Sequence, residues 1–150
     1  MPTIHVCGLA DVPSLSASLK PSRLLSMLSG ATAMPDTPPH LADHDHLRLA
    51  FHDVSSPQDG YEHPTERHVE QILAFTQSWD RQAPLLIHCF AGISRSTAAA
   101  FMTACALHPE VGELKIAKAI RDASETATPN RLMVAYADRL LGRNGRMESA

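Results

Sequence analysis

The chain lacks the features that mark several large classes of protein. It has only three cysteines, an odd and low number that indicates free thiols in a reducing compartment. No apolar run approaches the roughly 18 to 20 residues of a membrane span, so we expect no membrane partner. A formal net charge of −3 argues against a nucleic-acid partner. Together these absences predict a cytoplasmic globular protein.

Length and composition suit one domain with a single core, because the chain has 150 residues, of which 44% are hydrophobic and 19% charged. Strand-like runs alternate with helix-like segments, which predicts an α/β fold with a central, mostly parallel β-sheet flanked by helices. We expect one domain over residues 1–150, with a polar tail at 142–150 that frays. The expected strands are 3–7, 23–28, 46–52 and 85–88, and the expected helices are 13–19, 65–79, 95–107, 111–123 and 129–141.

The residues from 88 to 96 are the most informative part of the chain and read His88-Cys89-Phe90-Ala91-Gly92-Ile93-Ser94-Arg95-Ser96. An apolar run of strand type comes directly before this 88–96 loop, and an alanine-rich segment that favours helix follows it. The end of a strand and the start of a helix therefore surround one thiol. Backbone N–H groups and the helix dipole then point at the concave side of the loop, which predicts an anion site.

The residue types in this loop match the demands of a nucleophile beside a phosphate. A free thiol has a pKa near ~8.5, and a helix N-terminus and a nearby cation both lower the pKa of Cys89. The planar fork of Arg95 makes two parallel hydrogen bonds to phosphate, which lysine cannot. Gly92 permits positive φ and close backbone approach. Ser96 can donate to the sulfur, and His88 can fix the loop through its ring. The alternative is a buried structural cysteine in a strand-to-helix turn.

The 88–96 loop resembles the signature loop of cysteine-dependent protein tyrosine phosphatases, and its Ala-Gly-Ile-Ser-Arg-Ser ending is most similar to the dual-specificity branch. The resemblance implies that Cys89 attacks phosphorus to form a phosphocysteine and that Ser96 assists its breakdown. It also implies that the loop supplies the electrostatic stabilisation, with no metal and no cofactor. The implied phosphate-binding residues are Phe90, Ala91, Gly92, Ile93, Ser94 and Arg95.

The family also uses an aspartate as general acid, on a mobile loop that follows a strand upstream of the cysteine. Asp53 comes at the end of the predicted strand 46–52, where the family places its acid. Asp59 lies closer in sequence to Cys89, in an Asp-Gly pair that is typical of an ordinary turn. We favour Asp53, and the motif leaves Asp59 open.

A further match precedes the last predicted helix, where Thr128-Pro129-Asn130 predicts a helix start with Thr128 as N-cap and Pro129 at the first helical position. Dual-specificity phosphatases show the same Pro-Asn opening, so the resemblance extends from about residue 45 to residue 141. We interpret Asn130 as part of the helix start, with bracing of the 88–96 loop as the alternative.

Histidines and the remaining cysteines suggest no second site. His40, His44, His46 and His52 cluster in the sequence, but their spacing matches no familiar zinc pattern and no cysteine joins them. We therefore expect no metal. Cys7 and Cys105 are interpreted as small buried apolar residues, with a disulfide to Cys89 left open.

The sequence predicts a phosphomonoesterase whose substrate is a phosphorylated protein or a small phosphomonoester. Apart from Arg95 the loop carries no cation, and the absence of lysine favours a monophosphate of the phosphotyrosine type over a polyphosphoinositide. The alternative is a non-catalytic module of the same fold that binds phosphate or phosphoprotein. The intact Cys89 argues against it, because binding alone needs no nucleophile. Oligomeric state is left open.

Overall fold

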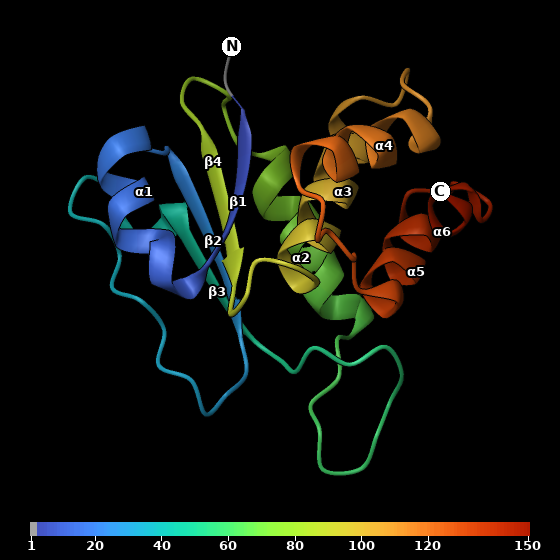
Figure 1. Cartoon of the computed structure of the whole chain (residues 1–150), viewed down its shortest axis with the longest axis horizontal. Helices are drawn as coiled ribbons and strands as arrows, with labels where there is room; N and C mark the ends of the chain where they lie inside the picture. The colour runs from blue at the N-terminus through green and yellow to red at the C-terminus, as the bar shows by residue number, and fades with distance from the viewer. Residues whose placement is uncertain (1–2) are drawn as a thin grey trace.

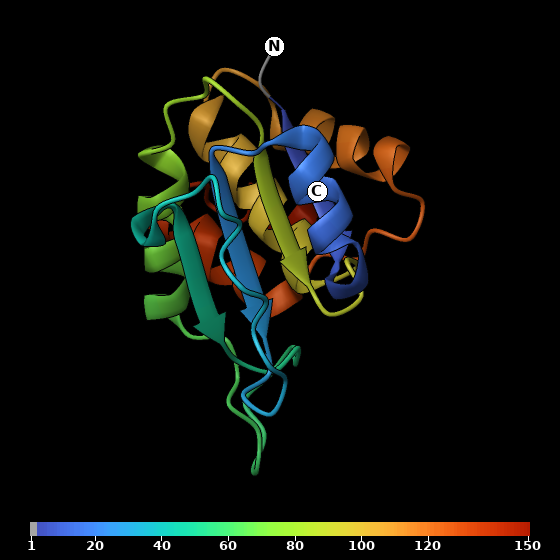
Figure 2. The same cartoon turned by 90° about the vertical axis from the view of Figure 1, so that its left-hand side faces the viewer.

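The computed structural model describes residues 3–150, and these form a four-stranded parallel sheet with helices on both faces (Figures 1 and 2). The strand order is β1-β4-β2-β3, so β4 and β2 are central. The predicted α/β fold is confirmed for this part of the chain; residues 1 and 2 of the predicted domain lie outside it. The strands are β1 (Ile4–Gly8), β2 (Arg23–Leu28), β3 (His46–Ala50) and β4 (Leu85–Cys89).

The two central strands read as nearly continuous apolar runs because both faces of the sheet are covered. Every residue of β4 is buried, as is every residue of β2 after Arg23. Side chains alternate between the faces: Leu86 packs in the smaller cluster, whereas Ile87 packs in the main core. The carboxyl end of β4 brings Cys89 to the edge of the sheet where parallel α/β folds bind ligands.

The helices cover the two faces of the sheet unequally. Helices α2, α3 and α5 build the main core on one face, and α3 contacts both β1 and β4. On the other face, Figure 2 shows only α1 and the 29–42 segment in front of the strands. No helix within residues 3–150 is long and apolar enough to cross a membrane. The helices are α1 (Val12–Leu19), α2 (Glu66–Gln77), α3 (Arg95–Leu107), α4 (Glu113–Ala123), α5 (Arg131–Leu140) and α6 (Arg146–Ser149).

Helix α5 begins later than the sequence predicts, and the predicted N-cap is wrong. Asn130 is the N-cap, since its Oδ1 accepts a hydrogen bond of 3.0 Å from the N–H of Met133. The hydroxyl of Thr128 instead donates to the carbonyl of Thr126. The N–H groups of Thr128 and Asn130 donate to the carbonyls of Ile93 and Ser94, which hold this segment against the 88–96 loop before the helix starts.

Residues 142–150, which the sequence predicts to fray, pack against the core in the structure. They include helix α6, and the side chain of Met147 is only 1% exposed. The buried carboxylate of Asp138 accepts from the N–H of Gly145 at 2.8 Å and of Met147 at 2.7 Å. Arg143 is buried too and pairs with Glu113 at 2.9 Å. Polar residues that looked solvent-exposed in the sequence therefore anchor the tail to the core.

We expect Asp138→Ala to lower the free energy of unfolding by about 2–4 kcal/mol, because it removes the acceptor of the buried N–H of Met147 and of the part-buried N–H groups of Gly145 and Glu148. Urea denaturation followed by circular dichroism measures this change. Glu148→Ala is the matched control, since that side chain is exposed, and a change within about 0.5 kcal/mol is expected. Equal stability of the two variants would mean that the tail frays after all.

Candidate active site

Strand β4 delivers Cys89 to the floor of the 88–96 loop, where its side chain is 3% exposed. The Cys89 Sγ lies 3.2 Å from the Oγ of Ser96. Burial raises the pKa of this thiol, but hydrogen bonds from the Ser96 hydroxyl and from the N–H groups of Ser96 and Gly92, together with the charge of Arg95, outweigh burial. The pKa of Cys89 is therefore lowered from its ordinary value, which favours the nucleophilic thiolate.

The 88–96 loop is held in its curled shape by the end of β1. Gly92 has φ +74°, and a Cβ there would lie 2.7 Å from the carbonyl carbon of Cys7, so only glycine fits. The N–H of Leu9 donates to the carbonyl of Phe90 at 3.0 Å. Among residues 3–150, no backbone oxygen accepts from the N–H groups of residues 90–95. Apart from the N–H of Gly92, which donates to the Cys89 sulfur, these donors are therefore available to an anion inside the loop.

Arg95 lies under the loop and is 6% exposed. One of its amino groups, Nη1, donates to the carbonyl of Phe51 at 2.8 Å, which fixes the guanidinium to the end of β3. Its buried Nε finds no hydrogen-bond partner in the part of the chain that the structure describes. An unpaired donor of this kind costs about 1–3 kcal/mol, more when charged, unless an acceptor enters from outside. An oxyanion in the 88–96 loop is an acceptor of the right charge.

Asp53 is brought to the 88–96 loop by two hydrogen bonds to one oxygen. Its Oδ1 accepts from the Oγ of Ser94 at 2.7 Å and from the Nδ2 of Asn130 at 2.7 Å. Asn130 is 2% exposed, and its amide nitrogen also donates to the carbonyl of Val54 at 3.0 Å. The sequence interpretation of Asn130 as only a helix start missed this bridge. The Pro-Asn opening before the last helix was the signal for it.

Asp59 lies in a different environment from Asp53. Both are exposed, but Asp59 lies in a tight turn in which the N–H of Tyr61 donates to the carbonyl of Gln58, and Gly60 has φ +82°. The 53–61 loop that carries it is closed at its base by a hydrogen bond of 2.7 Å from the N–H of His52 to Glu62. Figure 1 shows the segment between β3 and α2 extending away from the body of the protein. The fold thus ties Asp53, rather than Asp59, to the thiol-bearing loop.

The other two cysteines are unsuited to react with Cys89. Cys7 pairs with His88 in the β1–β4 register, so its side chain and that of Cys89 lie on opposite faces of the sheet. Burial raises the pKa of Cys7 to about 12 and that of Cys105 to about 11. Both thiols therefore stay protonated at neutral pH, and the register does not support a disulfide between Cys7 and Cys89.

The clustered histidines form separate contacts rather than a common site. His40 Nε2 bonds to the carbonyl of Pro21, and His52 Nδ1 accepts from the N–H of Glu62. His46 points to Ser26. Within residues 3–150, no three potential metal ligands gather to hold an ion.

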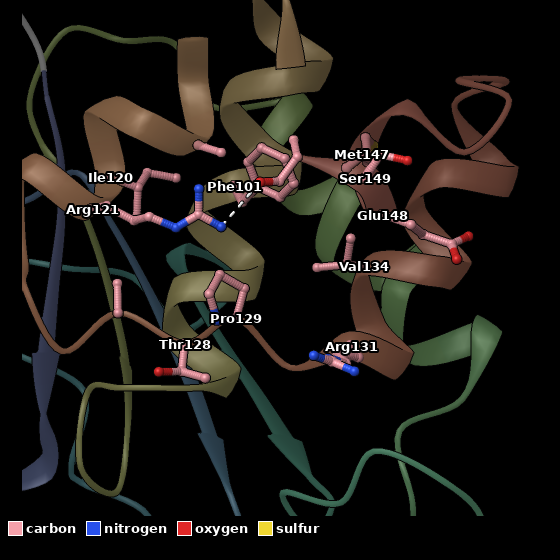
Figure 3. A pocket seen from close by; sticks show the side chains of 13 residues that line it. Phe101, Ile120, Arg121, Thr128, Pro129, Arg131, Val134, Met147, Glu148 and Ser149 are labelled. Carbon is pink, nitrogen blue, oxygen red and sulfur yellow. Dashed lines mark hydrogen bonds between the residues drawn. The ribbon is translucent and has the colours of Figure 1, made fainter. Parts of the chain in front are cut away.

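A hollow of about 610 Å³ lies away from the thiol, among α3, α4, α5 and the C-terminal residues (Figure 3). Its lining includes Phe101 and Val134 but neither Cys89 nor Arg95. Arg121 crosses it and donates to the carbonyl of Ala150 at 3.0 Å, the dashed line in Figure 3. No residue of the 88–96 loop lines this hollow, so it is separate from the thiol.

Comparison with known proteins identifies the fold. No family model matches the sequence, and no curated protein matches it. Among solved structures, DUSP15 superposes with a TM-score of 0.68 at 21% identity over 93% of this chain and 83% of that chain. Human DUSP28 also gives 0.68, at 19% identity over 95% and 96% of the two chains. The human tyrosine phosphatase-like serine/threonine/tyrosine-interacting protein gives 0.66, at 15% identity over 92% and 87%. The chain therefore has the dual-specificity-phosphatase-like fold.

Proposed function

We propose that this chain is a cysteine-dependent phosphomonoesterase that acts through a phosphocysteine intermediate. The observation that carries the proposal is the buried Arg95, whose Nε lacks a partner in the described chain, beside a thiol whose pKa is lowered. A structural cysteine needs neither feature. The N–H groups of residues 90–95, none of which donates to a backbone oxygen in the described chain, complete a site for the three non-bridging oxygens of a phosphate.

The proposed reaction has two steps. The Cys89 thiolate attacks phosphorus, the ester P–O bond breaks, and the leaving oxygen takes a proton from Asp53, which releases the alcohol. A water then attacks the phosphocysteine, Asp53 accepts its proton, and the P–S bond breaks to release inorganic phosphate. The Ser96 hydroxyl, 3.2 Å from the sulfur, stabilises the departing thiolate. Arg95 and the loop amides bind the phosphoryl oxygens throughout.

The surroundings of Asp53 suit a general acid. Both Ser94 and Asn130 donate to its Oδ1, and its Oδ2 has no partner among the described residues. A carboxyl group held in this way by one oxygen can carry its proton on the other. The bridge through Asn130 also ties the acid to the loop that carries the nucleophile, which limits its movement relative to the substrate.

The face of the 88–96 loop favours an aromatic monophosphate. Phe90 is 62% exposed and Ile93 is 37% exposed, so both offer apolar contact to a substrate ring. Arg95, the cation of the loop, is buried, which leaves no charge for a second phosphate. One solved structure of this fold is PTPMT1 in complex with PI(5)P, at 13% identity. The substrate class we propose, phosphotyrosine-type esters, therefore rests on the loop residues and not on the fold.

Hydrolysis of p-nitrophenyl phosphate by the wild-type protein under reducing conditions tests the proposal. The competing proposal is a module that binds phosphoprotein without turnover, and one solved structure of this fold is named a phosphatase-like interacting protein. Tungstate binding measured by calorimetry separates the two. Binding with turnover supports the enzyme, whereas binding by well-folded protein without turnover of aryl phosphates or phosphotyrosine peptides contradicts it and supports the module.

We expect Asp53→Asn to lower kcat for a phosphotyrosine peptide by about 100-fold and to remove the alkaline limb of its pH–rate profile, since the proton donor is lost. Asp59→Asn, in the exposed turn, is the matched control and should keep both. Steady-state kinetics over a pH series measures these effects. The assignment is wrong if Asp59→Asn loses rate and alkaline limb while Asp53→Asn keeps them.

A further inference from the structure

A row of buried polar side chains crosses the sheet on the face covered by α1 and the 29–42 segment. Ser26 in β2 pairs in register with His88 in β4, and both are fully buried. His46 at the start of β3 is 6% exposed. This face is otherwise a small apolar cluster, so buried polar groups need an explanation beyond packing.

These side chains form one continuous chain of hydrogen bonds. His88 Nδ1 lies 3.1 Å from the carbonyl oxygen of Cys89, and its Nε2 lies 2.6 Å from Ser26 Oγ. Ser26 Oγ lies 2.8 Å from His46 Nε2, and His46 Nδ1 lies 2.8 Å from Thr37 Oγ1. Arg48 Nη2 donates to the same Thr37 oxygen at 2.8 Å. The relay, residues 26, 37, 46, 48 and 88, thus runs from the surface to the nucleophile's own peptide group.

The direction of every proton in the relay follows from its two ends. A carbonyl can only accept, so His88 Nδ1 carries a hydrogen; with a neutral ring, its Nε2 must accept from the Ser26 hydroxyl. Because the Ser26 hydroxyl donates its hydrogen to His88, the Ser26 oxygen must accept a hydrogen bond from His46 Nε2–H. The bare Nδ1 of His46 accepts from Thr37, whose oxygen accepts from Arg48. All donors therefore point toward Cys89, and no group is left unpaired.

The charges of the two rings agree with this order. The pKa of His46 is lowered to about 4, mainly by burial; the charge of Arg48 and the neighbouring His88 act in the same direction, and Asp43 opposes them. Burial also lowers the pKa of His88, with Arg95 acting in the same direction against the bond to Cys89. Both imidazoles are neutral at neutral pH, as a one-directional chain requires. Successive bonds in such a chain polarise and strengthen one another.

We propose that Ser26 and His46 are positioning residues that act through His88 to orient the Cys89–Phe90 peptide and so set the reactivity of the nucleophile, a role that rests on the proposed function. The C=O and N–H of a trans peptide point in opposite directions. The bond from His88 to the Cys89 oxygen therefore aims the Phe90 N–H away from the relay, toward the side where the anion binds. Through Thr37, the relay also links the 29–42 segment to the site.

Alkylation of Cys89 by iodoacetate over a pH series tests the relay without requiring turnover, so its result is independent of the proposed function. In Ser26→Ala, His88 Nε2 loses the hydroxyl that donates to it and so fixes the ring tautomer. In the other tautomer, Nδ1 carries no hydrogen and cannot donate to the carbonyl oxygen of Cys89. We expect the midpoint of alkylation to rise by about 0.5–1 pH unit and kcat to fall by about three- to tenfold with little change in KM. Ser26→Thr, which keeps the hydroxyl, should restore both.

Thr76→Val is the matched control, because it also removes a fully buried hydroxyl, which within residues 3–150 bonds only to the carbonyl of Leu73 in α2. If Ser26→Ala folds poorly, His46→Leu tests the relay from its other end, and we expect the alkylation midpoint of Cys89 to rise as well. His46→Gln supplies an amide N–H in place of His46 Nε2–H and should restore the wild-type midpoint. The proposal is overturned if a folded Ser26→Ala or His46→Leu variant shows the same alkylation midpoint as wild type and Thr76→Val. It is supported if only the relay variants shift.

Discussion

Replacing Cys89 with serine is expected to lower hydrolysis of p-nitrophenyl phosphate by about four orders of magnitude or more, to the background rate. A serine hydroxyl ionises far less readily than a thiol, so the variant lacks the anionic nucleophile at neutral pH. The lowered pKa of Cys89 comes from hydrogen bonds and charge around the sulfur, and these donors bind phosphate equally well in the variant. Tungstate binding should therefore persist while turnover is lost.

Cys105→Ser is the matched control for this prediction, since Cys105 is buried in α3 and its pKa is raised to about 11. Mass spectrometry after rapid acid quench should find a phosphate adduct on Cys89 in wild type and in the control, and none in Cys89→Ser. Because the pKa of Cys89 is lowered, its alkylation should reach half its maximum rate below the pH typical of an ordinary thiol. Turnover by Cys89→Ser within tenfold of wild type would rule out a phosphocysteine.

Local features of the fold were predictable because their signals are contiguous in the sequence. The apolar run before Cys89 and the alanine-rich run after Ser94 identified β4 and α3, and the predicted helix 95–107 has the bounds observed. The glycine at position 92 indicated a positive φ, which the structure has. In each case a few neighbouring residues carry the whole physical reason.

Contacts between distant segments were beyond such inference. The bond from Asn130 to Asp53 joins residues that are 77 positions apart in the sequence. Thr128 was a good N-cap by composition, but its backbone N–H is bound to the carbonyl of Ile93, and so Asn130 is the N-cap and the helix starts at Arg131. The tail looked polar, yet Asp138 satisfies its backbone from inside the core. Tertiary hydrogen bonds override local preference at these positions.

Replacing Arg95 with lysine is expected to lower kcat/KM for phosphotyrosine peptides by about 1,000-fold, although the positive charge is kept. The guanidinium uses Nη1 to hold the carbonyl of Phe51 and keeps Nε without a partner in the described chain. A planar group can hold that carbonyl and still present two N–H groups to a phosphate, whereas an ammonium acts as a single point.

The stability of Arg95→Lys should change little compared with its activity, because the lysine can still donate to the Phe51 carbonyl that Arg95 binds at 2.8 Å. Arg139→Lys, an exposed arginine at the other end of α5 from Asn130, is the matched control and should keep wild-type kinetics. Kinetics and tungstate calorimetry on both variants separate the two roles of the guanidinium. If Arg95→Lys loses stability but retains kcat/KM within a few fold, the role of Arg95 is to stabilise the fold through its hydrogen bond to the Phe51 carbonyl. If tungstate affinity falls together with kcat/KM while the fold persists, the unpaired Nε donates a hydrogen bond to a phosphoryl oxygen of the substrate.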